Sequence, residues 1–335
     1  MPSFDKPLEE LVVYNPPVTS QPDLEAFWAA TFAESARAPL NPALQPVDYP
    51  ALKAKVYEIW YDGWRGARIC GWYIVPEGAT APLPAGTAGL PAETAGLPAV
   101  VHYHGYSGSK QDVWRYLMWA YQGYAVLAVD TRGQSGNSTD PGPYSGGHVK
   151  GWMTKGILDP QEYYYRGAYV DCVRALDWLA ARPEVDMARV GIMGMSQGGG
   201  LTLAVAALDP RPIVAIAEMP YLCCYPRAVR MAMRHPYLEI SEYIAKWPER
   251  EAQVWRTLTY FDNMNLAHRI QCPVLMDVGL LDDICPPSSV YATYNKITMP
   301  KEMRVYPFHN HEVVEAHWEL KLRWAHHYLK GVGSL

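Results

Sequence analysis

One short motif limits the local backbone of this chain more than any other feature. Residues 194–198 read Gly-Met-Ser-Gln-Gly, which is the pattern G-x-S-x-G. An apolar run at 190–193 precedes the motif, and a run of small residues at 198–207 follows it. In that context the serine lies on a tight strand-to-helix turn, and the glycines leave room for the neighbouring strand and helix. The motif therefore predicts a strand, a strained turn at Ser196 and a helix, with the serine hydroxyl projecting from a sheet edge.

Apolar strands alternate with helical segments along most of the chain. We expect a hairpin of strands at 54–60 and 67–75, then strands at 99–103, 124–129, 190–193, 213–217, 274–278 and 303–306. Helices are expected at 23–32, 113–122, 163–181 and 198–207, with a last helix after His311. Near-continuous apolar strands between helices are typical of a parallel sheet covered on both faces. Together with the motif, this pattern predicts an α/β-hydrolase fold with a mostly parallel central sheet.

Length and composition fit one α/β domain over residues 1–335. The chain has 335 residues, of which 49% are hydrophobic and 19% charged, so it has enough apolar residues for a core of its own. Two segments depart from the strand–helix alternation. Residues 77–98 carry a duplicated Thr-Ala-Gly-Leu-Pro-Ala unit and predict an exposed insertion loop. Residues 227–266 lack strand signals and predict a helical cap or lid over the sheet, or alternatively a packing arm between subunits.

Charge and cysteine usage exclude several classes of function. The formal net charge is -5 and long basic runs are absent, so we expect no nucleic-acid or anionic-membrane partner. Apolar runs stay below the roughly 18 residues that a membrane helix needs. Acids and prolines near the N-terminus disfavour a signal peptide. The six cysteines show no metal-binding spacing, which predicts free thiols in the reducing cytoplasm.

A serine nucleophile needs a base to remove its proton and an acid to orient that base. In the predicted fold the chain order is serine, acid, histidine. The acid belongs in the loop after the strand at 274–278, where Asp282 and Asp283 are adjacent candidates. Spacing favours Asp282 over Asp283 by a small margin. Asp277 lies within the strand itself, which makes it a poor candidate.

The base should follow the last strand, at 303–306. Three histidines lie there, and His317 is the weakest candidate because it falls within the predicted C-terminal helix. His309 and His311 share one loop. His311 comes just before the helix, where a base can point back at the sheet edge. Two of the three must be ordinary solvated or capping residues.

Acyl transfer also needs donors for the oxyanion. One donor should be the backbone N–H of Gln197, directly after the serine. The other should come from the loop after the strand at 99–103, where Gly105 permits close approach and leaves the Tyr106 N–H as the second donor. His102 and His104 have a spacing that metal sites use. Because no acid or cysteine accompanies them, we expect no metal there.

Three motifs together make the chain resemble the acetyl xylan esterase and cephalosporin C deacetylase family, carbohydrate esterase family 7. They are Arg-Gly-Gln at 132–134, Gly-x-Ser-Gln-Gly at 194–198 and His-Glu at 311–312. The segments 151–160 and 260–265 are similar to that family as well. The resemblance runs nearly end to end and is interrupted at the duplicated segment, which is not part of the family pattern.

The resemblance implies a catalytic set and a function. It implies Ser196, Asp282 and His311 as catalytic residues, with Tyr106 and Gln197 as oxyanion donors. It implies removal of acetyl groups from small substrates, namely acetylated xylo-oligosaccharides and cephalosporin C, by a serine esterase without cofactor. It also implies a cytoplasmic ring-like hexamer. The alternatives are a peptidase or a broader short-chain carboxylesterase of the same fold, and a non-catalytic binding protein.

Two further segments have expected roles of their own. Arg132, which follows the strand at 124–129, is interpreted as a guanidinium that ties loops together beneath the site. Residues 221–226 follow the strand at 213–217 and are expected to line the acyl pocket, where their side chains would influence acyl preference.

Overall fold

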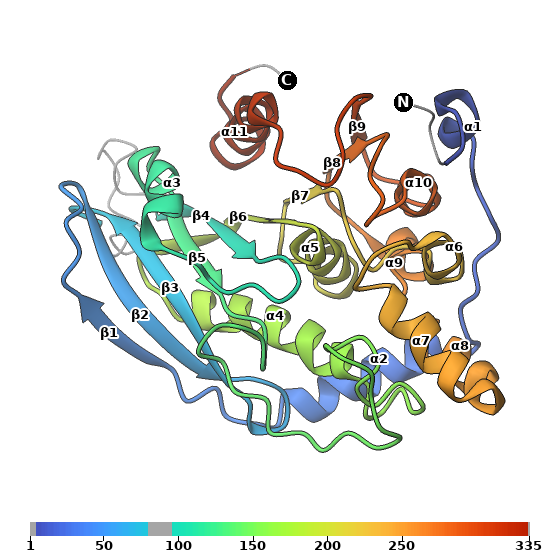
Figure 1. Ribbon diagram of the computed structural model, residues 1–335. Helices are drawn as coiled ribbons and strands as arrows, with labels where there is room; N and C mark the ends of the chain where they lie inside the picture. Colours follow the sequence, from blue (N-terminus) through green and yellow to red (C-terminus); the bar gives the residue numbers. More distant parts are fainter. Residues whose placement is uncertain (1–4, 80–95, 334–335) are drawn as a thin grey trace.

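A single sheet forms the centre of the computed structural model, which describes residues 5–79 and 96–333 (Figure 1). Its strand order is β1-β2-β3-β5-β4-β6-β7-β8-β9. The strands are β1 (Ala43–Val47), β2 (Ala54–Asp62), β3 (Arg68–Pro76), β4 (Leu97–Tyr103), β5 (Ala125–Val129), β6 (Val185–Met195), β7 (Val214–Glu218), β8 (Val274–Gly279) and β9 (Lys301–Tyr306). From β5 to β9 all neighbouring strands pair in parallel, whereas β1, β2 and β3 pair antiparallel.

Helices cover both faces of the sheet, as the strand pattern predicts. One face packs against α4 (Tyr164–Ala180) and α5 (Gln197–Leu208), and its core includes Trp178 and Leu201. The other face packs against α3 (Leu117–Tyr121) and α11 (Glu315–Lys330), and its core includes Trp119 and Trp324. Outside the segment between β7 and β8, the other α-helices of the described residues are α1 (Leu8–Val12), α2 (Leu24–Ser35) and α10 (Pro287–Tyr294), and a 3-10 turn at Val113–Tyr116 precedes α3.

The segment between β7 and β8 is helical, as predicted. It contains α6 (Tyr225–Met231), α7 (Leu238–Lys246), α8 (Glu251–Leu258) and α9 (Asn263–Leu266). Figure 1 shows α7 and α8 in orange, at the end of the molecule farthest from β1. One of these helices touches the loop after β4, because Glu239 of α7 accepts a hydrogen bond from the Tyr106 hydroxyl at 2.7 Å. A role for this segment as a lid remains a prediction.

The duplicated insertion lies almost wholly outside the described residues. Its residues 80–95 are not described, and β4 already begins at Leu97. All six cysteines are buried free thiols in this structure. Among the described helices, none combines the length and the apolar character needed to cross a membrane.

The parallel strands bring distant parts of the chain to one edge of the sheet. The carboxyl ends of β4, β6, β8 and β9 face the same way, because these strands belong to the parallel part of the sheet. Side chains that directly follow those strands therefore gather there, and this edge is where open α/β sheets bind ligands. Ser196, Asp282 and His311 all lie in such positions.

Candidate active site

Ser196 lies at a strained turn between β6 and α5. Its backbone has φ 57° and ψ -119°, a conformation with positive φ that non-glycine residues rarely adopt. Two backbone hydrogen bonds fix the turn. The Ser196 N–H donates to the Glu218 carbonyl at 2.9 Å, and the Ser196 carbonyl accepts from the Tyr221 N–H at 2.9 Å. A Cβ at Gly198 would collide with the carbonyl oxygen of Tyr103. The predicted strand–turn–helix geometry is therefore confirmed.

Asp282 and His311 form a hydrogen-bonded pair. Asp282 lies in the loop after β8 and is fully buried, and its Oδ2 is 2.8 Å from Nδ1 of His311. The other carboxylate oxygen accepts from the N–H groups of Ile284 at 2.9 Å and Cys285 at 2.8 Å. A carboxylate oxygen facing His311 Nδ1 favours the tautomer in which Nδ1 carries the proton, and in that tautomer Nε2 is free to accept one.

The other acidic candidates have different partners. Asp283 forms an ion pair with Arg234, with its Oδ2 3.0 Å from Nε. Asp277 lies inside β8, and its Oδ1 accepts from the Met219 N–H at 2.6 Å. Among the three aspartates, Asp282 is the one in contact with a histidine of the loop after β9.

The other histidine candidates are also placed by the structure. His317 lies in α11, is fully buried, and its Nδ1 is 2.9 Å from the Tyr306 hydroxyl. His309 packs its ring against Tyr306, with ring centres 5.5 Å apart. His311 is the candidate that lines the same cavity as Ser196.

That cavity has a volume of about 770 Å³. This is within the roughly 300–1,000 Å³ of typical small-molecule sites. Ser196, His311, Gly105 and Tyr106 line it, together with aromatic residues of the 3-10 turn, α3 and α11. The segment 221–226, expected to line an acyl pocket, does not border this cavity. Its Tyr221 is fully buried, with its ring centre 4.0 Å from that of Tyr237.

The loop after β4 is held by a histidine whose role the sequence did not reveal. His104 Nδ1 is 2.7 Å from the Gly105 carbonyl, and its Nε2 accepts from the Thr131 N–H at 2.8 Å. Both ring nitrogens are thus engaged with the backbone, and burial lowers the pKa of His104. This contact fixes the loop that carries the Tyr106 N–H. It also leaves neither nitrogen available as a metal ligand.

Gln197, the first residue of α5, is held through its side chain. Its amide pairs reciprocally with that of Gln134, at 2.8 Å and 3.1 Å. The Tyr165 hydroxyl donates to the same Gln197 oxygen at 3.0 Å. Gln134 was noted in the sequence only as part of the Arg-Gly-Gln motif. The structure shows that it connects the loop after β5 to the N-terminus of α5.

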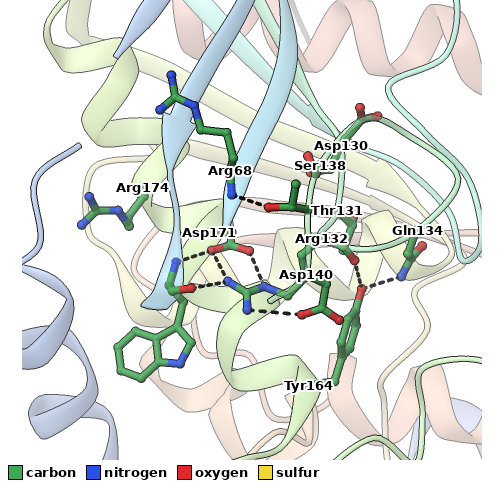
Figure 2. A network of polar contacts seen from close by, with 12 residues as sticks. Arg68, Asp130, Thr131, Arg132, Gln134, Ser138, Asp140, Tyr164, Asp171 and Arg174 are labelled. Carbon is green, nitrogen blue, oxygen red and sulfur yellow. Dashed lines mark hydrogen bonds and ion pairs between the residues drawn. The ribbon is translucent and has the colours of Figure 1, made fainter. Parts of the chain in front are cut away.

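Arg132 ties this loop to the body of the molecule, as predicted (Figure 2). Its guanidinium donates to both carboxylate oxygens of Asp171, at 2.6 Å and 2.8 Å, and to the Trp64 carbonyl at 2.9 Å. Burial alone would lower the pKa of Arg132, but the Asp171 carboxylate reverses that effect and raises it. The Tyr164 hydroxyl donates to the Arg132 carbonyl at 2.6 Å and accepts from Gln134 at 3.0 Å.

Two groups of potential metal ligands occur among the described residues. The first is Asp282, Cys285 and His311, and the second is Glu218, Asp277 and His317. In the first group the acid and the histidine bond each other, and burial raises the pKa of the Cys285 thiol well above its usual range. In the second group the Lys321 ammonium already occupies a cation position, 2.9 Å from Glu218.

A sequence-family model and a related protein both match most of this chain. The sequence model of a family described as Acetyl xylan esterase (AXE1) matches residues 1–328. Acetyl esterase Axe7A of Xylanibacter ruminicola is 30% identical over 302 residues, which cover 88% of this chain and 64% of that protein. The chain therefore spans less than two thirds of that relative's length.

Solved structures agree in fold and sequence. The acetyl xylan esterase from Paenibacillus sp. R4 is 43% identical, with a TM-score of 0.91 over 97% of this chain and 100% of that chain. Acetyl xylan esterase 1 from Thermoanaerobacterium sp. JW/SL YS485 is 34% identical, with a TM-score of 0.87 over 96% and 98% of the two chains. The α/β hydrolase GrgF from Penicillium sp. sh18 is 18% identical, with a TM-score of 0.55 over 82% and 99%, and shows the fold alone. The predicted α/β-hydrolase fold is confirmed.

Proposed function

This chain belongs to the acetyl xylan esterase family, and we propose that it removes acetyl groups from small acetylated substrates through Ser196. Family membership supports the assignment of a carboxylic ester hydrolase. The serine mechanism and the substrates are our proposals. Acetylated xylo-oligosaccharides are the first proposed substrate class, and the 3'-acetate of cephalosporin C is the second.

The proposed mechanism has two steps. Ser196 Oγ attacks the ester carbonyl while His311 Nε2 takes its proton, and Asp282 holds the imidazole in the required tautomer. The backbone N–H groups of Tyr106 and Gln197 stabilise the oxyanion. The alcohol leaves with the proton from His311. Water then attacks the acetyl-enzyme by the same route, and acetate and free serine are released.

One observation carries the proposal. The Asp282–His311 pair, at 2.8 Å, lies beside a cavity of about 770 Å³ that Ser196 also lines. A nucleophile at a strained turn, a base of fixed tautomer and room for a substrate are the parts that acyl transfer requires. Because all the proposed groups are protein groups, the mechanism involves no cofactor and no metal.

A chain-length series tests the activity. We expect the wild-type enzyme to hydrolyse 4-nitrophenyl acetate faster than the butyrate and the octanoate. Ser196→Ala should lower kcat by at least about 10³-fold, since loss of a catalytic serine leaves only binding and oxyanion stabilisation. Ser289→Ala is the matched control, because Ser289 is a fully buried serine in α10 that does not border the cavity.

Each outcome of that series has a definite meaning. Fastest hydrolysis of the octanoate would replace the proposal with a broader carboxylesterase. Cleavage of an acylated peptide in place of the esters would favour a peptidase. Wild-type activity in Ser196→Ala would overturn the serine mechanism.

Assembly and location are further proposals. We propose a hexamer in which the active sites face an inner chamber, as the family resemblance implies, and a cytoplasmic location. The six buried free thiols suit a reducing compartment and support that location. Sedimentation analysis of the purified chain should give the mass of six chains. A monomer at working concentrations would contradict the proposed assembly.

A further inference from the structure

The cavity that contains Ser196 continues to a polar floor on the α11 side of the sheet. Glu218, the last residue of β7, and Lys321 of α11 line this floor. Lys321 Nζ is 2.9 Å from Glu218 Oε2, and the two side chains are only 10% and 8% exposed. A buried ion pair needs further hydrogen-bonding partners to offset its desolvation. Because both residues border the cavity, a bound ligand can supply such partners.

Aromatic rings form the walls around this ion pair. Lys321 Nζ lies 4.7 Å from the centre of the Trp318 ring, and the Trp318 and Trp119 rings meet edge to face with centres 5.3 Å apart. Both tryptophans and Tyr116 line the cavity. Flat apolar walls above a few buried polar groups are typical of small-molecule sites.

His102 adds a polar atom without a partner. Its ring lies 5.1 Å from that of Tyr116 and 5.8 Å from that of Trp119, and it also lines the cavity. Within the described part of the chain, His102 Nε2 is buried and finds no hydrogen-bond partner. An unpaired buried polar atom is costly, so such atoms usually meet a ligand or water.

The floor carries no net charge at neutral pH. Burial lowers the pKa of His102 to about 3 and that of His317 to about 3, so both imidazoles are neutral. Burial, together with the neighbouring Glu218 carboxylate, raises the pKa of Asp277, which favours its neutral form. The Lys321 ammonium and the Glu218 carboxylate cancel each other. A floor of this kind favours an uncharged ligand with hydroxyl groups over an anion or a metal cation.

The proposed chemistry decides which part of an ester reaches this floor. His311 must donate its proton to the leaving oxygen, so the alcohol lies on the side of the cavity where His311 lies. Val313, Trp318 and Lys321 follow His311 along the chain and line the same cavity. An alcohol on the His311 side of the cavity can therefore extend toward α11.

We propose that Glu218, Lys321 and His102 form a subsite that hydrogen-bonds the hydroxyl groups of the leaving alcohol, while Trp318 packs against its ring. The ligand class is a neutral polyhydroxylated ring, as in a sugar. This inference rests on the proposed esterase function. It assigns the enzyme's selectivity for the alcohol part of the ester to the Glu218–Lys321 ion pair.

A selectivity ratio tests this subsite. The ratio is kcat/KM for acetylated xylobiose divided by kcat/KM for cyclohexyl acetate, whose ring carries no free hydroxyl. We expect the double variant Glu218→Gln/Lys321→Met to lower this ratio about 10- to 100-fold, mainly through KM for the sugar ester. That is the loss expected for one or two hydrogen bonds to charged groups. The double change leaves no buried charge unpaired, and it keeps the Glu218 carbonyl that accepts from the Ser196 N–H.

A matched ion pair outside the cavity provides the control. Asp209 follows α5 at the end remote from Ser196, and its Oδ1 accepts from Arg211 Nε at 2.9 Å. The variant Asp209→Asn/Arg211→Met should leave the ratio at the wild-type value. If the Glu218/Lys321 double variant fails to fold, Trp318→Leu tests the same subsite and should lower the ratio in the same direction.

The subsite is overturned if the double variant or Trp318→Leu folds and keeps the wild-type ratio, including the case in which both esters lose activity equally. Failure of the esterase proposal would look different. In that case the wild-type enzyme would hydrolyse neither ester, or Ser196→Ala would remain active on both.

Discussion

At the scale of single residues, the side-chain amides of Gln134 and Gln197 form a reciprocal pair of hydrogen bonds. This pair joins the loop after β5 to the first turn of α5, whose leading N–H is a proposed oxyanion donor. A donor of this kind contributes only if it is aimed at the oxyanion before the reaction begins. Gln134 is therefore interpreted as a positioning residue that touches no substrate.

We predict that Gln134→Met lowers kcat by about 10- to 100-fold with little change in KM. The reason is that a displacement of about 1 Å at a reacting group can cost 10²-fold in rate. Steady-state kinetics with 4-nitrophenyl acetate measure both constants. Gln45→Met is the control, since Gln45 is exposed on β1. A loss confined to KM, or no loss, would contradict the positioning role.

Sequence spacing placed the acid and the base in two loops that meet in the structure, but it favoured Asp282 over Asp283 only by a small margin. Asp282 and Asp283 are adjacent, so what separates them is the direction of each side chain. That direction depends on partners far along the chain, because Asp283 pairs with Arg234 and Asp282 with His311. The choice made from the family resemblance agrees with this pairing. Its catalytic meaning remains a prediction.

At the scale of elements, the turn between β6 and α5 depends on the absence of a side chain at Gly198. The space that a Cβ would need is already taken by the carbonyl oxygen of Tyr103 in β4. Backbone atoms of a central strand cannot move aside without disturbing the sheet.

We predict that Gly198→Ala lowers the free energy of unfolding by at least about 3 kcal/mol, the upper range for overpacking a core. Urea denaturation measures this loss. Gly105→Ala is a matched control, because the nearest atom to a Cβ there is 3.8 Å away. We expect it to change the free energy of unfolding by less than about 1 kcal/mol. Equal stability of the two variants would show that the turn tolerates a side chain.

Most strands of the parallel sheet could be predicted because they contain short apolar runs. Every residue of β5, β7 and β8 is buried, which is what such runs indicate. By contrast, β1 was missed. It contains Pro46 and three exposed residues, and among the described strands it pairs only with β2, at the sheet edge. Its conformation is imposed by that pairing rather than by its own sequence.

At the scale of the whole molecule, Arg132 connects parts that are remote in sequence. Its guanidinium joins Asp171 of α4 to the turn at Trp64 between β2 and β3 (Figure 2). Arg132 and Asp171 side chains are both only 4% exposed. Removing one partner of such a pair leaves an uncompensated buried charge.

We predict that Arg132→Met lowers the free energy of unfolding by about 3–5 kcal/mol, the usual cost of breaking a buried ion pair. The double variant Arg132→Met/Asp171→Asn should recover part of this loss, because it removes both charges. Urea denaturation of the two variants and the wild type gives the comparison. A double variant less stable than the single one would contradict the charge argument.

The cavity could not be predicted at this scale. Its lining comes from residues as distant in sequence as His102, Glu218 and Lys321, which meet only through the strand order and the packing of α11. The helical character of 227–266 was predictable from composition. The contact of its Glu239 with Tyr106 was not, because it depends on how that segment folds back over the sheet.

The most direct test of Ser196 as the nucleophile is covalent labelling with a fluorophosphonate, which reacts with activated serine nucleophiles. Mass analysis after proteolysis locates the label. We predict one phosphonyl group per chain, carried by the peptide that contains Ser196, with loss of esterase activity in step with labelling and no label on Ser196→Ala. A label on another residue, or full activity in a fully labelled enzyme, would contradict the assignment of Ser196 as the nucleophile.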